Sequence, residues 1–183
     1  GSTQPLEQIT DALNSAIGSG VRWQDSLALL GVTEKAAVAG QATLAESTEL
    51  LVGTLNAYHL GVDQAARISD VFFRTVGDGT ISIADLADGF GSIAPLAAAA
   101  GVPVETLGAA LAVLTQQGIQ PSEAITYLKG ALSALINPSS EAAKLAEDLG
   151  IGFDAQALKS KGLAAVLGWR FSRLDPVLQG LLW

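Results

Sequence analysis

The sequence lacks cysteine and methionine altogether and contains one histidine among its 183 residues. The absence of cysteine excludes disulfides, thiolate metal sites and thiol nucleophiles. The absence of methionine indicates a chain that does not start at its own initiation codon. Gly1-Ser2 resembles a cloning scar, so residues 1-2 are left out of the fold argument. We expect a segment cut from a longer protein.

Basic residues are also scarce. The chain has 10 Lys and Arg against 18 Asp and Glu, which gives a formal net charge of −8. Proteins that bind nucleic acids cluster their basic side chains to displace counterions from phosphates. Here the basic residues are scattered along the chain. The sequence therefore predicts no specific nucleic-acid binding, and its acidic sign predicts repulsion of a passing nucleic acid.

Charged residues of either sign make up only 15% of the chain, whereas 49% of its residues are apolar. This composition excludes intrinsic disorder and raises the question of a membrane. The least polar stretch, Ile93–Leu114, is long enough to span a bilayer, but Pro95, Gly101 and Pro103 interrupt it. We favour buried core helices and keep a membrane-active segment as the alternative.

Glycine followed by a branched apolar residue recurs along the chain. Glycine takes the left-handed C′ position after a helix without steric cost, and the next residue packs back on the last turn. Five pairs predict helix ends in this way: Gly31-Val32, Gly61-Val62, Gly101-Val102, Gly118-Ile119 and Gly150-Ile151.

Helix starts are marked by capping residues. Two segments fit the capping box, in which the first residue and the acid three positions later bond each other's backbone. The predicted starts are the boxes Thr43/Glu46 and Ser82/Asp85, Pro121 at a first helical position, and the N-caps Thr33 and Asp63.

Between these marks the apolar residues recur at helical spacing, as at Leu107, Leu111 and Leu114. The sequence predicts an all-α fold, a compact multi-helix domain of about nine to eleven short helices. Within it we expect N-terminal helices over 3-42, a core domain over 43-152 and C-terminal helices over 153-183. The predicted helices lie near 4–18, 22–30, 33–40, 43–59, 63–76, 82–99, 103–117, 121–136 and 139–149, with one or two more between 154 and 182.

The segment Gly77–Asp85 resembles the second half of an EF-hand calcium loop, with Gly79 at the invariant glycine. In that register Arg74 and Val76 occupy positions 1 and 3, where calcium needs side-chain oxygen. The better explanation is a Gly-Asp-Gly turn followed by Ser82 as an N-cap. No calcium site is predicted.

His59 is the one histidine and falls at the end of a predicted helix, where a cation complements the helix dipole. Without cysteine or a second histidine, a zinc site is not expected. Ser47, Ser69, Asp63 and Asp70 are ordinary helix residues with no nucleophile-elbow motif around them. Most other acids fall at predicted helix starts, and no phosphate-binding loop is present. The sequence therefore predicts no catalytic, cofactor-binding or metal-binding residue, and not an enzyme.

Several segments in a fixed order carry a family resemblance. The chain resembles the conserved core of phage tail tape measure proteins, the phage minor tail family. The segments are Thr54–Tyr58, Asp70–Phe73 with Thr75, Ile93–Val102, Glu105 with Leu107–Leu111, Gly118–Ala124, Leu128–Ser133, Asn137–Ala143, Leu149–Ile151 and Gly162–Ala164. The segment Trp169–Arg173 departs from the family pattern, and long coiled-coil regions are absent.

The resemblance implies a structural role in the phage tail. A tape measure protein lies in the lumen of the tail tube, its length sets tail length during assembly, and it leaves before DNA passes. The implied location is the virion tail, with the host cytoplasm during assembly. The implied partners are the tail tube protein, tail assembly chaperones and tail tip proteins, and self-association through alanine-rich helices is left open.

A compact domain of this length is about 30–40 Å across, near or above what a narrow lumen admits. We therefore expect this segment to extend into long helices inside the tail or to stay at one end.

Overall fold

The computed structural model describes residues 5–141 and 144, and no strand occurs among them. The all-α prediction is confirmed, but the described part holds seven α-helices rather than nine to eleven. They are α1 (Leu6–Gly18), α2 (Trp23–Gly40), α3 (Leu44–Ala57), α4 (Ala65–Asp78), α5 (Ile83–Ala100), α6 (Val104–Gln116) and α7 (Pro121–Ile136), with a 3-10 turn, η1 (Val62–Gln64), before α4. Most of the helix predicted over 139–149, the Gly150-Ile151 pair and the helices predicted beyond 154 lie outside the described residues.

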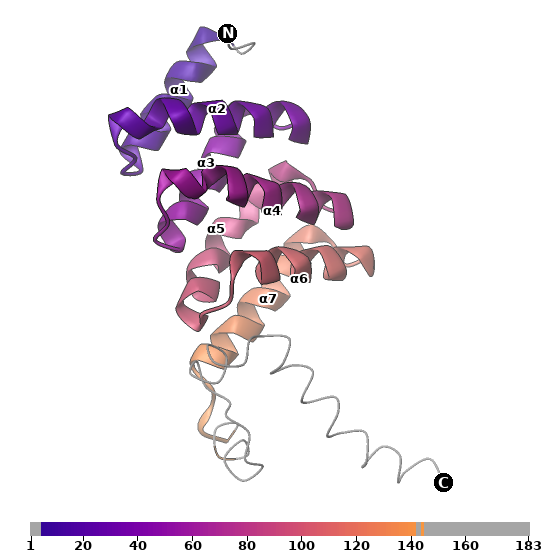
Figure 1. Ribbon diagram of the computed structural model, residues 1–183. Coiled ribbons are helices and arrows are strands. Elements are labelled where there is room, and N and C mark those ends of the chain that lie inside the picture. Colours follow the sequence, from indigo (N-terminus) through magenta and orange to yellow (C-terminus); the bar gives the residue numbers. More distant parts are fainter. Residues whose placement is uncertain (1–4, 142–143, 145–183) are drawn as a thin grey trace.

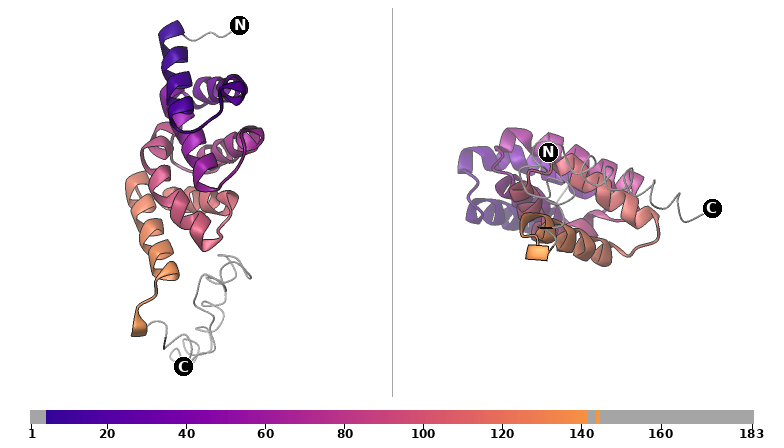
Figure 2. Two further views of the ribbon diagram at one scale, coloured as in Figure 1. Left: turned by 90° about the vertical axis from the view of Figure 1, so that its left-hand side faces the viewer. Right: turned by 90° about the horizontal axis from the view of Figure 1, so that it is seen from below.

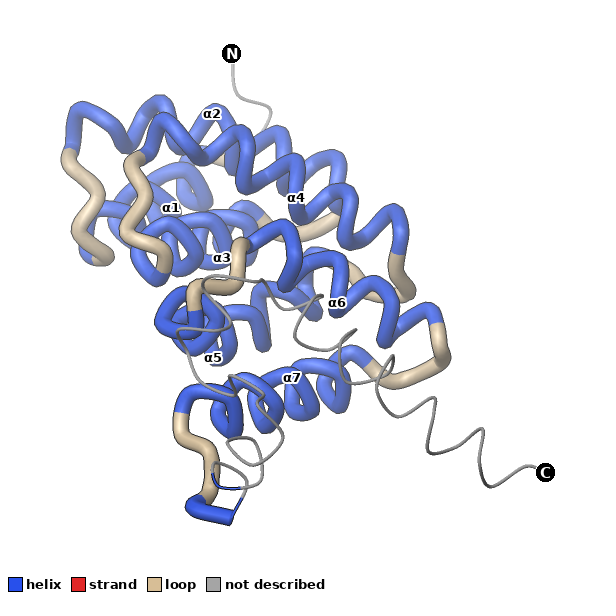
Figure 3. Tube along the Cα trace, turned by 60° about the horizontal axis from the view of Figure 1, so that its bottom comes forward, coloured by secondary structure: helices blue, strands red, loops and turns tan. Residues whose placement is uncertain are grey.

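The helices form a stack of two layers (Figures 1 and 2). One layer holds α1, α3, α5 and α7, and the other holds α2, α4 and α6, as the tube in Figure 3 also shows. The most extensive contacts run within the layers, from α3 to α5, from α5 to α7 and from α4 to α6. Successive helical hairpins are therefore laid one on another, with α1 and α2 at one end of an elongated body.

The buried residues of the second layer repeat at a constant interval of about 39 residues, which is typical of stacked helical repeats. Leu29 of α2, Ile68 of α4 and Leu107 of α6 follow this interval and are all fully buried. It also relates the buried residues Thr33, Phe72 and Leu111. The repeat conserves burial but not residue type, so it is not visible as similarity within the sequence.

Two of the predicted glycine helix ends are confirmed. Gly101 and Gly118 have φ angles of 74° and 85°, and after the first the Val102 N–H donates to the Ala97 carbonyl at 2.8 Å. This is the six-residue bond of a Schellman motif. Gly20, with φ of 93°, ends α1 in the same way and was not among the predicted pairs.

The predicted helix end at Gly31-Val32 is wrong, because α2 continues through it to Gly40. Thr33 is not an N-cap but a buried residue inside α2, and its hydroxyl donates to the Leu30 carbonyl at 3.0 Å. The helices predicted at 22–30 and 33–40 are thus one helix. A glycine inside a helix costs about 1 kcal/mol, which tertiary packing readily offsets.

The predicted end at Gly61-Val62 is also wrong. Gly61 has φ of −77° and precedes η1, while His59, with φ of 54°, takes the left-handed position. The N–H of Leu60 then donates to the Leu55 carbonyl at 2.8 Å. Asp63 caps nothing, since η1 has no side-chain cap.

The other predicted starts are confirmed. Thr43 and Ser82 are N-caps with complete capping boxes, in which Glu46 and Asp85 accept from the N-cap backbone. Pro121 is the first residue of α7. These residues fix the starts of three of the four helices in the first layer.

The core runs without interruption from α1 to α7, and α5 lies at its centre. Its side chains Leu86, Phe90 and Ile93 have no exposed surface. Phe90 meets Phe72 of α4 edge to face, with ring centroids 5.2 Å apart, the favoured geometry for an aromatic pair.

The helices α4 and α6 approach each other too closely for a side chain at Gly79. A Cβ atom there would lie 2.8 Å from the Thr75 carbonyl oxygen and 2.9 Å from the Ala112 Cα. Across the same contact the Thr80 N–H donates to the Thr115 hydroxyl at 3.1 Å. The Thr115 Oγ1 would also lie 2.8 Å from this Cβ. Two of the three close neighbours are backbone atoms, which cannot move aside as a flexible side chain would.

We expect Gly79→Ala to lower the free energy of unfolding by about 1–3 kcal/mol, as overpacking does. Gly77 is the matched control, because it lies two residues earlier in α4 and has no atom within 4 Å of an added Cβ. Gly77→Ala should be neutral or stabilising by up to about 1 kcal/mol. Urea unfolding followed by circular dichroism measures both, and equal stability of the two variants would contradict the close contact.

Candidate functional site

The segment resembling half a calcium loop is occupied by helix caps. The Asp85 carboxylate accepts from the Ser82 N–H at 2.9 Å and from its hydroxyl at 2.6 Å. The predicted N-cap is confirmed, but the predicted Gly-Asp-Gly turn is not, since Gly77 and Asp78 are the last residues of α4. In the described part of the chain, no three His, Cys, Asp or Glu side chains group as metal ligands would.

His59 lies just after α3, as predicted, but its role there is one of backbone geometry. It is exposed and holds the left-handed conformation, for which histidine is enriched among non-glycine residues. Ser47 and Ser69 are buried inside helices. The structure therefore does not place an exposed imidazole and a serine nucleophile in one site.

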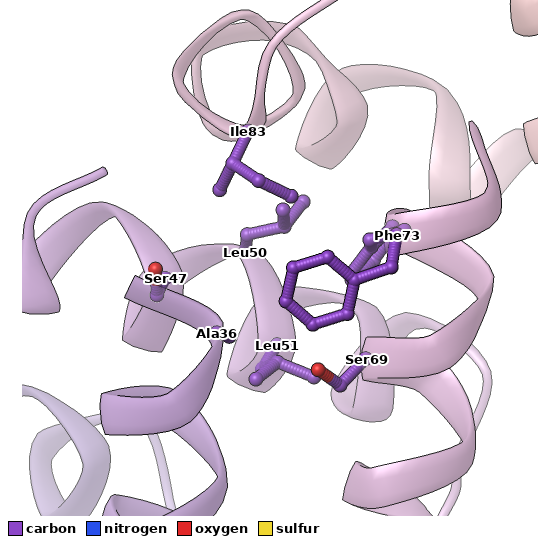
Figure 4. A pocket seen from close by; sticks show the side chains of 8 residues that line it. Ala36, Ser47, Leu50, Leu51, Ser69, Phe73 and Ile83 are labelled. Atoms are coloured by element: carbon purple, nitrogen blue, oxygen red, sulfur yellow. The ribbon is translucent and has the colours of Figure 1, made fainter. Parts of the chain in front are cut away.

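The two serines instead line a small internal cavity with Ala36, Leu50 and Phe73 (Figure 4). Its volume is about 10 Å³, whereas ligand pockets measure about 300–1,000 Å³. The Ser47 hydroxyl has no hydrogen-bond partner. The space corresponds to one water molecule at most and is a packing defect between α2, α3 and α4.

A larger open groove of about 550 Å³ lies where α2 ends beside α4 and the start of α5. Its lining includes Gln41, Phe73, Ile81 and Asp85. Asp85 is its one titratable residue, and its carboxylate is engaged in the Ser82 cap. The groove has no acid–base pair with which to carry out catalysis.

Burial and charge perturb the Tyr58 phenol without creating a reactive group. Burial, and secondly the negative charge of Glu105, raise the pKa of Tyr58 well above its usual value, so the phenol stays protonated. Its hydroxyl is buried and unpaired. Glu105 itself pairs with Arg67 across α4 and α6, and Arg22 pairs with Asp25 at 2.7 Å.

The Ile93–Leu114 stretch is not one helix. The chain reverses at Gly101, so this stretch forms the end of α5 and most of α6. Among the described helices, α5 is long and apolar enough to cross a membrane by length and composition. Its apolar side chains, however, form the centre of the core, which accounts for its hydropathy.

The geometry of the site does not identify the family of the chain, but comparison with known proteins does. A family model described as phage-related minor tail protein matches residues 1–169. The chain belongs to this family. It is 34% identical to the tape measure protein of Pneumococcus phage Dp-1 over 126 residues, which is 69% of the chain and 11% of that relative. It is 32% identical to the probable tape measure protein of Escherichia phage P2 over 120 residues, 66% of the chain and 15% of that relative.

The minor tail family membership confirms the resemblance that the sequence segments indicate. No solved structure matches the chain. The chain spans only about a tenth to a seventh of the length of these two relatives. Membership also agrees with a non-enzymatic chain, since both relatives are tape measure proteins.

The Thr43/Glu46 capping box predicts that the free energy of unfolding depends on pH. The Thr43 backbone N–H and then its hydroxyl bond the Glu46 carboxylate and hold its pKa below the ordinary value of 4.5. Its contribution to stability is therefore complete above the unfolded pKa and is lost as the pH falls through the lower folded pKa.

We expect Glu46→Gln to be less stable than the wild type by up to about 1 kcal/mol at pH 7, with the difference shrinking as the pH falls below 4.5. Thermal unfolding at each pH measures it. Glu49→Gln is the control, because Glu49 lies on the same helix outside the capping box. A wild-type advantage that does not shrink as the pH falls below 4.5 would contradict the assignment.

Proposed function

We propose that the chain is a structural segment of a phage tail tape measure protein. In this proposal the whole protein occupies the lumen of the tail tube, sets tail length during assembly and is released at DNA ejection. It is made in the host cytoplasm and carried in the virion tail. The observation that carries the proposal is the similarity to two tape measure proteins over about two thirds of the chain.

The charge distribution supports a protein that lets DNA pass. The net charge is −8, and Arg22 and Arg67 are engaged with carboxylates. The six Lys and Arg residues of the described part are spread along the sequence, so they form no basic cluster in the sequence there for a phosphate backbone. The proposed partners are proteins: the tail tube protein, tail assembly chaperones and tail tip proteins.

The stacked architecture bears on where this segment lies. As a single α-helix, Leu6–Ile136 would be about 200 Å long. Folded as three successive hairpins and α7, spaced about 10 Å apart, it contributes about 40 Å. The uninterrupted core favours the folded form, so we propose that this segment remains a stack at one end of the tail.

Deleting the segment from the parent gene tests this placement. If the stack remains folded at one end, tails that assemble should shorten by less than about 40 Å, measured by electron microscopy. Shortening by about 200 Å would instead mean that the segment lies in the tube as extended helix. An equally long deletion in a predicted coiled-coil region of the same protein serves as the control.

A membrane-active segment aiding genome passage is the second candidate, favoured by the length and hydropathy of α5. It requires the stack to open, because Ile93 and Leu107 are fully buried. We expect the folded chain to cause no leakage of dye from liposomes. Leakage that Leu107→Glu abolishes would favour the membrane function over the structural one.

A further inference from the structure

The contact between α4 and α6, which we call the α4–α6 junction, is fastened by three polar interactions. They are the bond from the Thr80 N–H to the Thr115 hydroxyl at 3.1 Å, the bond from the Gln116 amide to the Asp78 carbonyl, and the ion pair of Arg67 with Glu105. The first two join the C-terminal ends of the two helices, and the ion pair joins their N-terminal ends. The two helices are therefore tied together at both ends.

The corresponding contact between α2 and α4, the α2–α4 junction, has no side chains for such bonds. At the interval of about 39 residues, Ala28, Ala66, Val76 and Gly77 stand in the places of Arg67, Glu105, Thr115 and Gln116. None of these four replacements has a hydrogen-bonding group in its side chain. The contacts between α2 and α4 are also less extensive than those between α4 and α6, and the groove of about 550 Å³ lies open beside them.

The buried face of α2 is also smaller and more polar than that of α6. Ser26 and Thr33 of α2 are buried at the positions that Val104 and Leu111 occupy in α6. Both hydroxyls donate to carbonyls of α2 itself, so these bonds do not hold α2 to its neighbours. Because burial stabilises in proportion to the apolar area removed from water, α2 is held less firmly than α6.

An unpaired hydroxyl is buried at the same place. Ser47 of α3 is 1% exposed, and its hydroxyl has no hydrogen-bond partner. It lines the small cavity between α2, α3 and α4 together with Ala36 of α2, as Figure 4 shows. A hydroxyl that is removed from water without a partner opposes burial. Separation of α2 would return this hydroxyl to water.

We propose that the stack opens at the α2–α4 junction: α1 and α2 separate as one unit from α3–α7, which stay folded, and then close again. The hinge is the loop Gln41–Thr43, in which Gln41 has a φ angle of 52°, a conformation that is costly for residues other than glycine. The proposal compares two junctions within the chain, so it does not depend on where the stack ends. It is also independent of the role in the tail.

Native-state hydrogen exchange of the unmodified chain tests the proposal. The buried amides of α1 and α2 should share one protection factor, at least about tenfold below that of α6. Their protection should also fall less steeply with urea than that of α5, because partial opening exposes less surface than global unfolding. One protection factor and one urea slope throughout the chain would overturn the proposal. Protection that only declines gradually toward residue 5, as in fraying, would also overturn it.

Thiol labelling gives a second measurement, because the chain has no cysteine and one introduced thiol reports on one place. Ala36 on α2 and Ala112 on α6 are matched, with exposed fractions of 5% and 4%. Ala36→Cys should react with a thiol reagent at least about tenfold faster than Ala112→Cys. Equal rates would contradict opening at the α2–α4 junction. Circular dichroism checks folding, and Ala94→Cys on α5 replaces Ala112→Cys if that variant does not fold.

The unpaired hydroxyl supplies the most specific test. Added to Ala36→Cys, Ser47→Ala should slow the labelling at least about threefold, because it removes a group that lacks a partner only in the closed state. Ser26→Ala is the matched control, since Ser26 is also 1% exposed but bonds the Trp23 carbonyl on its own helix, whether the junction is open or closed. Labelling that Ser47→Ala leaves unchanged, or that both variants slow equally, would refute the role of this junction.

Discussion

The burial of α5 between α3 and α7 is the contact on which the rest of the fold depends. A helical hairpin of this size cannot cover its own apolar face, so each one is stable only when another is laid on it. In this chain α5 is the middle of that arrangement, and its side chains Phe90 and Ile93 have no exposed surface. Within the second layer α4 and α6 pack closely on each other, because small residues such as Gly79 and Gly108 leave room for the facing helix.

This constraint explains a composition that first raises the question of a membrane. A thin stack has a large surface for its length, yet it must bury at least one side of every helix. Alanine and glycine achieve this without bulk: alanine is counted in the 49% of apolar residues, and the chain has 20 glycines besides. The few charges that remain are mostly acidic, and none is among the buried residues of the described part.

Features that depend on a few neighbouring residues, such as helix caps, can be predicted from the sequence. Features that depend on packing between distant helices cannot. The capping boxes at Thr43 and Ser82 and the glycines at 101 and 118 act within five residues, so their chemistry is visible in a short window. Gly31 and Gly61 look the same in that window, but the packing of α2 and the left-handed His59 decide their conformations. The repeat of about 39 residues cannot be found from the sequence alone, because Thr33, Phe72 and Leu111 occupy equivalent buried positions but differ in residue type. The prediction that the chain has no catalytic residues rests on short motifs in the same way. The exposure of Trp23, Leu27 and Val38 on α2, in contrast, can be recognised only from the structure. The predicted division at residues 42 and 43 remains a prediction.

The two-layer order has a mechanical consequence. Because the main contacts of each hairpin are with its immediate neighbours, tension applied at one terminus acts on one interface at a time. The chain can then be drawn out hairpin by hairpin, at a force set by a single layer rather than by the whole body. A body of this kind yields to a pull on its end one hairpin at a time, so the drawn-out chain can pass in single file through an opening narrower than the folded stack.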